Sequence, residues 1–296
     1  MKFEKYHPFI NLLFFVSVIV FSILFNHPIF LIISYLCSFI YSVKLNGKKG
    51  FIFNVACILF IVIYPFIYSS YCHFGITVLT TNFIENNITL ESLIYGLVIS
   101  IIVVSVIMWF SCINTVFSSD KIIYLFGKVS HNLSLYLAII LRTMPQIKDE
   151  FKKTANARKC IGKGIKQKNI LKCIKNFANI ISIVITWTIE NFIEKANSMN
   201  NRGYKLKDKT TFSIYRFDNR DRSFIILMFF LLTIISVGIA LEQTTILYNP
   251  QIIFVLPTSA SYIFYIAYVT FSLLPFTAQT INEIKFKKLC DKIKSF

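Results

Sequence analysis

The sequence predicts an all-α integral membrane protein with about six transmembrane helices. Of its 296 residues, 55% are hydrophobic and 15% are charged, whereas a typical soluble domain carries about 25% charged residues. Six stretches are almost free of charge and have about the length that a helix needs to cross ~30 Å of hydrocarbon. These stretches are continuously apolar, which favours helices, because the strands of a membrane barrel alternate between two faces.

The positively charged loops give the orientation of the predicted spans. All 31 Lys and Arg residues fall before the first span, between the second and third, between residues 121 and 222, or after residue 284. Because Lys and Arg are retained on the cytoplasmic side during insertion, both termini are predicted to be cytoplasmic, in a multi-pass protein of the cell membrane. The predicted spans are 9–25, 28–43, 51–70, 92–112, 223–241 and 252–276.

The first apolar stretch could instead be the core of a cleaved secretion signal. No small-residue cleavage pattern follows it, and Asn26-His27-Pro28 is typical of a tight turn between two helices, so a retained span is favoured. The layout then predicts four regions: a four-span membrane region (1–112), a cytoplasmic helical region (113–222), two C-terminal spans (223–276) and a basic cytoplasmic tail (277–296).

The net charge of +17 could indicate a nucleic-acid partner or simply the excess of positive charge on the inner side. The second interpretation is favoured, because no nucleic-acid-binding motif or aromatic stacking platform accompanies the basic residues. Anionic lipids of the inner leaflet are the expected partners of a Lys-rich stretch within the cytoplasmic region. Its members are Lys163, Lys166, Lys168, Lys172 and Lys175.

The residues that would support chemistry in this chain are missing from the sequence or scattered along it. The seven Cys have no spacing that ligates zinc. No GxxxxGK[ST] phosphate loop occurs, and the interiors of the predicted spans lack Asp, Glu, Lys and Arg. Glu190 and Glu194 lie one helical turn apart, but a solvated helix face explains them better than paired-carboxylate catalysis. We therefore expect no catalytic residue, metal site or bound cofactor.

Two helices of the cytoplasmic region are predicted to end near an arginine. Pro145 suits the first turn of a new helix, on which Ile147, Phe151 and Ala155 form a narrow apolar stripe. Arg158 lies near the expected end of this helix, and Gly162 and Gly164 follow as helix breakers.

A second helix is predicted over residues 167–201, and Arg202 directly precedes Gly203 at its end. Its uncharged middle, residues 177–189, reaches only about 20 Å, so we expect a helix packed beneath the bundle rather than a seventh span. A guanidinium at a helix end is suited to a bidentate pair with a partner's carboxylate. Periodicity alone favours the alternative, in which both arginines cap their own helix carbonyls or contact lipid phosphate.

Three ordered segments add a family resemblance. They are LRTMP at 141–145, ANARK at 155–159 and KANSMNNRGY at 195–204, and two closing spans follow. This order resembles the transmembrane T component (EcfT/CbiQ family) of energy-coupling factor transporters, in which two helices each end in Ala-Arg-Gly. Both arginines are present here, while Lys159 stands where the first Gly is expected and Asn201 where the second Ala is expected.

The resemblance implies a non-catalytic scaffold of an ATP-driven importer. Two cytosolic ATP-binding cassette ATPases would bind ATP and Mg and hydrolyse the ATP, and a separate capture subunit (S component) would take up a vitamin or metal ion. The residues implied at the ATPase-docking sites are Arg158, Arg202, Ala157 and Gly203, with Leu141, Arg142, Pro145 and Tyr204 supporting the coupling helices. The candidate platform for the capture subunit is Phe177, Ile181, Ile185 and Trp187, which could alternatively pack on this chain's own spans.

Three other classes of membrane protein are weaker alternatives. A secondary transporter would need polar residues or broken helices at the bilayer midplane. A conventional ABC permease would bind its own solute, and a lipid-modifying enzyme would need a His, Asp or Glu cluster at the interface, which the sequence does not offer.

Overall fold

The protein is almost entirely helical in the computed structural model, which describes residues 3–72, 74–81, 87–165, 169–204, 215, 217–248 and 258–294. The chain divides into two compact units. Unit 1 comprises Met1–Ser118 and Tyr215–Phe296, and unit 2 comprises Ser119–Ile214. The predicted four-region division remains a prediction.

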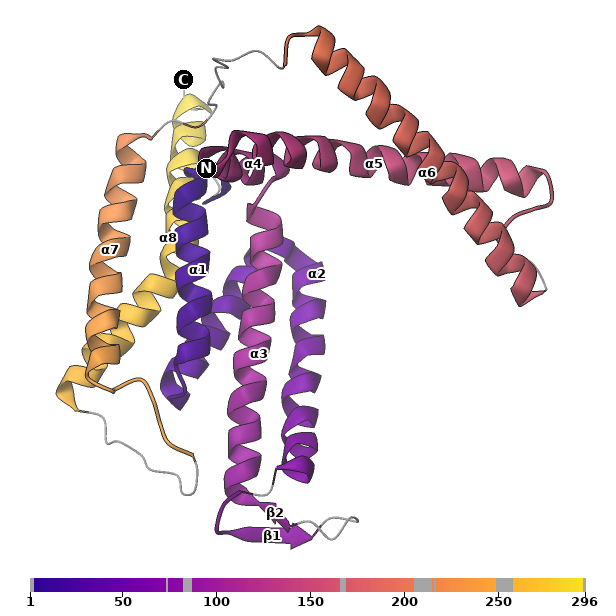
Figure 1. Ribbon diagram of the computed structural model, residues 1–296. Helices are drawn as coiled ribbons and strands as arrows, with labels where there is room; N and C mark the ends of the chain where they lie inside the picture. The colour runs from indigo at the N-terminus through magenta and orange to yellow at the C-terminus, as the bar shows by residue number, and fades with distance from the viewer. Residues whose placement is uncertain are drawn as a thin grey trace. The chain divides into compact units, whose positions relative to one another are not determined.

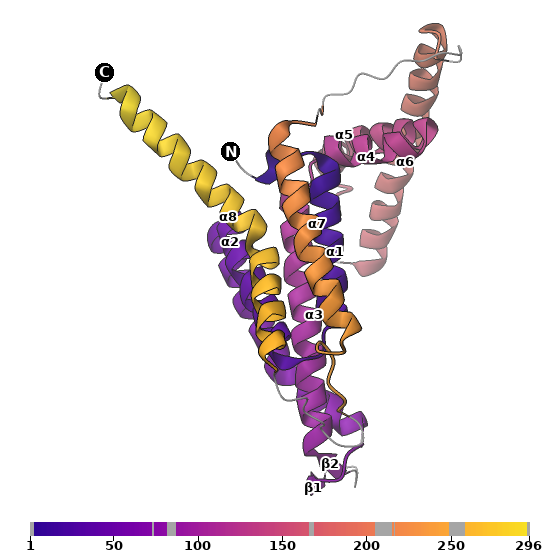
Figure 2. The same cartoon turned by 90° about the vertical axis from the view of Figure 1, so that its left-hand side faces the viewer.

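Unit 1 is a bundle of long helices (Figures 1 and 2). A short 3₁₀ turn (Phe3–Lys5) leads into α1, and α2 and α3 follow, with α7 and α8 contributed by the C-terminal part of the chain. The bounds are α1 Pro8–Leu24, α2 Pro28–Tyr71, α3 Leu90–Val116, α7 Asn219–Ala240 and α8 Ser259–Lys294. The start of the sixth predicted span, residues 252–257, lies outside the described residues.

The first two helices begin in the same way, at a His-Pro pair. His7 Nδ1 accepts a hydrogen bond from the amide of Phe9, and His27 Nδ1 accepts one from Ile29, each at 3.3 Å. The proline in the first helical position lacks an N–H that would have no partner there. Each pair therefore sets a helix start.

Helix α2 contains two antiparallel segments that reverse at Gly47. Gly47 has φ +59°, a conformation that glycine adopts without steric penalty. Ser42 Oγ donates to Asn54 Oδ1 at 3.2 Å, although residues twelve apart in a straight helix would be separated by about 18 Å. The predicted second and third spans are therefore the two segments of α2, and the predicted loop between them is mostly helical.

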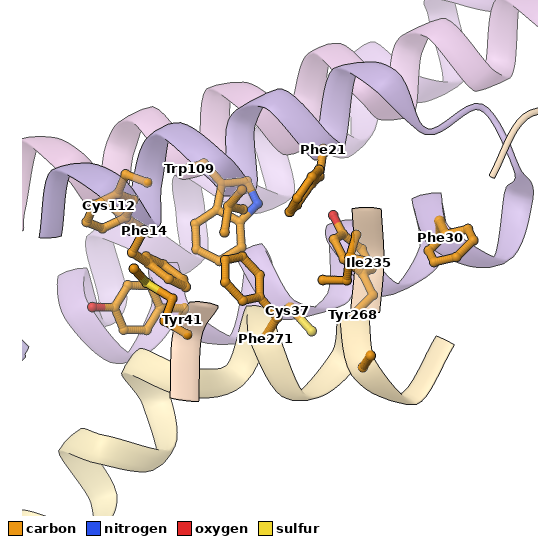
Figure 3. Close-up of a cluster of buried hydrophobic side chains, with 14 of the residues drawn as sticks. Phe14, Phe21, Phe30, Cys37, Tyr41, Trp109, Cys112, Ile235, Tyr268 and Phe271 are labelled. Atoms are coloured by element: carbon orange, nitrogen blue, oxygen red, sulfur yellow. The ribbon is translucent and has the colours of Figure 1, made fainter. Parts of the chain in front are cut away.

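Aromatic side chains fill the centre of unit 1 (Figure 3). Trp109 of α3 is fully buried, and its ring lies 6.0 Å from Phe14 of α1 and 6.1 Å from Tyr41 of α2. Phe14 in turn lies 5.5 Å from Phe271 of α8. Edge-on and tilted ring pairs of this kind are favourable beyond the area they bury. The same cluster contains Met228 and Ile235 of α7, so the core joins α1, α2, α3, α7 and α8 from both ends of the chain.

Two further contacts fix the arrangement of α2 within unit 1. Gly96 of α3 packs closely on α2, because a Cβ placed there would lie 3.0 Å from the Cα of Pro65. Close approach at a small residue is the usual way in which membrane helices pack. Near the reversal, Lys44 Nζ lies 3.6 Å from Glu283 of α8 and 4.4 Å from the Phe276 ring centroid.

A small β-hairpin, which the sequence did not predict, lies between α2 and α3 (Figure 1). Strand β1 (Val78–Thr81) pairs antiparallel with β2 (Asn87–Thr89), on the side predicted to be external. Glu91, in the first turn of α3, accepts a hydrogen bond from Thr77 Oγ1 at 2.8 Å. A carboxylate at a helix N-terminus is favoured by the exposed amides there.

Unit 2 contains α4 (Ser119–Val129), α5 (His131–Cys160) and α6 (Ile170–Asn201), with α5 packed on both others. The prediction that a helix begins at Pro145 is wrong, because α5 continues through this residue from His131. A proline inside a helix removes one backbone hydrogen bond, which the remaining bonds and packing of a long helix can tolerate.

Within the described residues, five helices are long and apolar enough to cross a membrane, namely α2, α3, α6, α7 and residues 259–281 of α8, and α1 is a shorter apolar helix. With α2 counted as two segments, unit 1 supplies the six predicted spans. Helix α6 also meets the criteria of length and composition, so its predicted cytoplasmic position remains a prediction. The fold is that of an all-α membrane protein.

Candidate functional site

Arg158 lies in the last turn of α5, which ends in a glycine turn. Gly162 has φ +74°, and its amide donates to the Lys159 carbonyl at 3.0 Å, while the Lys163 amide donates to the Arg158 carbonyl at 2.9 Å. This pair of bonds satisfies carbonyls that have no partner further along the helix. The turn that ends the helix thus lies at Gly162, and not at Lys159, which stands where the resemblance places a glycine. The sequence indicated Gly162 as a helix breaker.

The end of α6 repeats the same backbone turn. Gly203 has φ +77°, its amide donates to the Asn200 carbonyl at 3.0 Å, and the Tyr204 amide donates to the Met199 carbonyl at 3.1 Å. The predicted termination of this helix at Gly203 is therefore confirmed.

The two arginines occupy different positions relative to these matching turns. Arg158 precedes Gly162 by four residues, whereas Arg202 directly precedes Gly203 and is the C-cap of its helix. An offset of three helical residues corresponds to about 4.5 Å along the axis and about 60° around it. The sequence suggested that the two ends are alike. The backbone turns at the two ends are alike, but the two arginines occupy different positions relative to those turns.

Both guanidiniums lack an intramolecular partner within the described ranges. Arg158 is half-buried, and its Nε is enclosed without a hydrogen-bond partner there, while Arg202 is exposed. Because backbone amides already cap both helix ends, neither arginine is needed for that role. An enclosed guanidinium N–H without a partner is unfavourable. A carboxylate from another molecule that reached the accessible N–H groups of either guanidinium would form a charge-assisted hydrogen bond.

Helices α5 and α6 contact each other where they cross (Figure 1). On α5, the predicted apolar stripe of Ile147, Phe151 and Ala155 is partly buried. On α6, the buried residues are Ile180 and Val184. The rings of Phe151 and Phe177 lie 6.2 Å apart. The arginine-bearing ends therefore belong to two helices that are packed together.

The candidate platform residues lie mainly on an open face of α6. Phe177, Ile181 and Ile185 are spaced four residues apart, which places them on one face, and they remain 43%, 37% and 52% exposed. Trp187 is half-buried and lies away from that face, on the side of the buried Ile180 and Val184. Among the other predicted residues, Leu141 is half-buried, while Arg142, Pro145, Ala157 and Tyr204 are exposed.

Sequence reasoning missed a polar contact between α5 and α6, formed by Thr143, Gln146 and Lys195. No spacing pattern connects residues about fifty positions apart. Within the part of the chain that the structure describes, no group of three or more His, Cys, Asp or Glu residues could hold a metal ion. Lys166 and Lys168 of the predicted lipid-binding stretch lie outside it.

Comparison with known protein families places most of the chain within one family. A family model described as CbiQ, cobalt transport protein, matches residues 4–212, which include α1 to α6 and both helix ends. No curated protein matches the chain.

Proposed function

This chain belongs to the CbiQ family of cobalt transport proteins, and we propose that it is the transmembrane scaffold of an energy-coupling factor importer. In this proposal two cytosolic ATP-binding cassette ATPases dock on the ends of α5 and α6. A separate membrane subunit captures the cargo, a vitamin or metal ion, and the scaffold transmits the work of ATP hydrolysis to it. ATP and Mg are bound by the ATPases, and this chain has no catalytic role.

The observation that carries the proposal is the pair of matching helix ends with an arginine at each. Both backbones are capped by their own amides, so neither arginine is needed for capping, and the half-buried Arg158 and the exposed Arg202 can each offer a guanidinium to a carboxylate of another protein. The arginine guanidinium is planar and permanently charged, so its contact with a carboxylate is both strong and directional. Ala157 is exposed beside Arg158, and Gly203 is half-buried beside the exposed Arg202, so a partner surface can approach each helix end.

The packing of α5 on α6 supports a coupling role. Because α5 and α6 are packed together, displacement of their ends would move each helix as a rigid body. Rigid-body movement of packed elements is a common form of conformational switching. The exposed face of Phe177, Ile181 and Ile185 offers an apolar surface for the capture subunit. The residues that would support the position of these two helices lie on them or directly after them, namely Leu141, Arg142, Pro145 and Tyr204.

The test is co-purification of the full chain with its ATPases from a membrane. We expect Arg158→Ala and Arg202→Ala each to weaken the complex by about 2 to 5 kcal/mol, because each change leaves a partner carboxylate unpaired. The double variant should lose the ATPases altogether. Lys159→Ala is the matched control, since it removes an exposed neighbouring charge from the same turn and should retain them.

Unchanged binding and unchanged ATP-driven uptake in the double variant would overturn the proposal. Uptake of solute by the purified chain alone, without ATPases, would instead favour a secondary transporter. Binding of solute by this chain within an ATPase complex would favour a conventional permease.

A further inference from the structure

A lysine of α6 bridges to two side chains of α5. Lys195 Nζ donates to Thr143 Oγ1 at 3.2 Å and to Gln146 Oε1 at 3.0 Å. The ammonium also lies 5.8 Å from the ring centroid of Phe192, within reach of a cation–π interaction. Lys195 is half-buried, and it is the only Lys or Arg between residues 176 and 201. Its charge is thus held by partners on two helices.

The acceptors on α5 are prepared for this cation by the local helix geometry. Thr143 and Gln146 are three residues apart, which places them on one face of α5. The Thr143 hydroxyl donates to the Ile139 carbonyl at 2.7 Å, so its lone pairs are free to accept from Lys195. Thr143 is only 2% exposed, whereas the Gln146 side chain is exposed.

Pro145 lies between the two acceptors. It has no N–H to donate to the Leu141 carbonyl four residues earlier, so α5 lacks one backbone bond at this point. A helix is most easily bent at an internal proline. The contact from Lys195 therefore lies where α5 lacks a backbone hydrogen bond. Lys195 Nζ on α6 binds Thr143, which precedes the proline, and Gln146, which follows it.

We propose that Lys195 is a positioning residue, which clamps α6 to α5 across Pro145 and so fixes the point about which the two helices turn. This inference rests on the proposed function, because a fixed pivot matters only if displacement of one helix end must be passed to the other. Without the clamp, α5 bends at Pro145 and absorbs the displacement. With it, the angle between the helices changes instead.

The first experiment measures the clamp in the isolated full-length chain. Spin labels are placed on the native Cys160 at the end of α5 and on Ser198→Cys near the end of α6, with the remaining cysteines replaced by alanine. Pulsed electron resonance then gives the distribution of distances between the two ends. We expect Lys195→Met and Thr143→Val to broaden it, while Gln146→Glu, which supplies an ion pair, keeps it narrow. Lys172→Met, an exposed lysine on the same helix, is the control.

The second experiment measures transport per ATP hydrolysed in the reconstituted complex with ATPases and capture subunit. Lys195→Met should lower this ratio by about 2- to 30-fold, the usual range for residues that carry coupling, while the ATPases still co-purify. Lys195→Arg should restore part of it, because Arg retains the charge and the donors. Loss of co-purification by Lys195→Met would show a general structural role and overturn the proposal.

Equal distance distributions in Lys195→Met, Thr143→Val and the wild type would also overturn it. The outcome is separable from the proposed function, since the distances need no ATPase. Failure of the wild-type chain to hold ATPases would refute the scaffold proposal and leave the distances as the measure of the clamp.

Discussion

The reversal of α2 at Gly47 can be tested by a double-mutant cycle on Ser42 and Asn54. Asn54 is fully buried, accepts from Ser42 Oγ at 3.2 Å and donates to the Phe39 carbonyl at 3.4 Å. Ser42→Ala removes one of these bonds, and Asn54→Ala removes both. Hydrogen bonds between membrane helices average about 0.6 kcal/mol and reach about 1.7 kcal/mol. We therefore expect losses of about 0.6 kcal/mol for Ser42→Ala and about 1 to 3 kcal/mol for Asn54→Ala.

The coupling energy between the two changes is the decisive quantity. If the side chains touch, the double variant should be more stable than the sum of single losses predicts, by about 0.6 kcal/mol. Reversible unfolding in mixed detergent micelles measures all four proteins. Ser17 is the matched control, because its hydroxyl bonds only to carbonyls of its own helix, so Ser17→Ala and Asn54→Ala should be additive. A coupling of zero between Ser42 and Asn54, in a folded protein, would refute the reversal and with it the count of six spans.

Three further outcomes follow from the packing and the helix ends. Gly96→Ala should destabilise the folded protein by about 1 to 3 kcal/mol, measured by thermal unfolding in detergent, because the new methyl group presses on the backbone of α2; an unchanged melting temperature would contradict this close approach. Gly162→Ala and Gly203→Ala should each cost about 1 to 2 kcal/mol, because alanine is strained at positive φ, and hydrogen exchange in the last helical turn should rise; unaltered exchange would argue against the glycine turns. Lys44→Met should cost at most about 1 kcal/mol at low salt and nothing at high salt, since its ion pair is partly exposed; a loss that persists at high salt would point to packing instead.

The membrane helices were predictable because their signals are long and redundant. A charge-free run of about twenty residues has few alternatives to a span, and the one-sided distribution of Lys and Arg constrains the order of the loops. The glycine turns were also predictable, because Gly162 and Gly203 follow the last apolar positions of their helices.

The features that were missed depend on contacts or on weak local signals. Pro145 is typical of a helix start, yet α5 passes through it. The hairpin strands are three and four residues long and carry no strong pattern. The contact of Lys195 with Thr143 joins residues about fifty positions apart, which no local rule connects. The different placement of the two arginines required the positions of both glycine turns, since the similar letters around Arg158 and Arg202 suggested equivalence.

Because Arg158 and Arg202 are placed differently relative to their glycine turns, the two helix ends are different binding sites. Two copies of one ATPase would present identical binding surfaces, but the backbone positions of the two arginines differ by about 4.5 Å and about 60° relative to their own glycine turns. Under the proposed function, one ATPase surface could not bind both helix ends in the same way. The scaffold would therefore discriminate between its two ATPases, with Arg158 selecting one and Arg202 the other, and so would fix which ATPase occupies which side of the assembly.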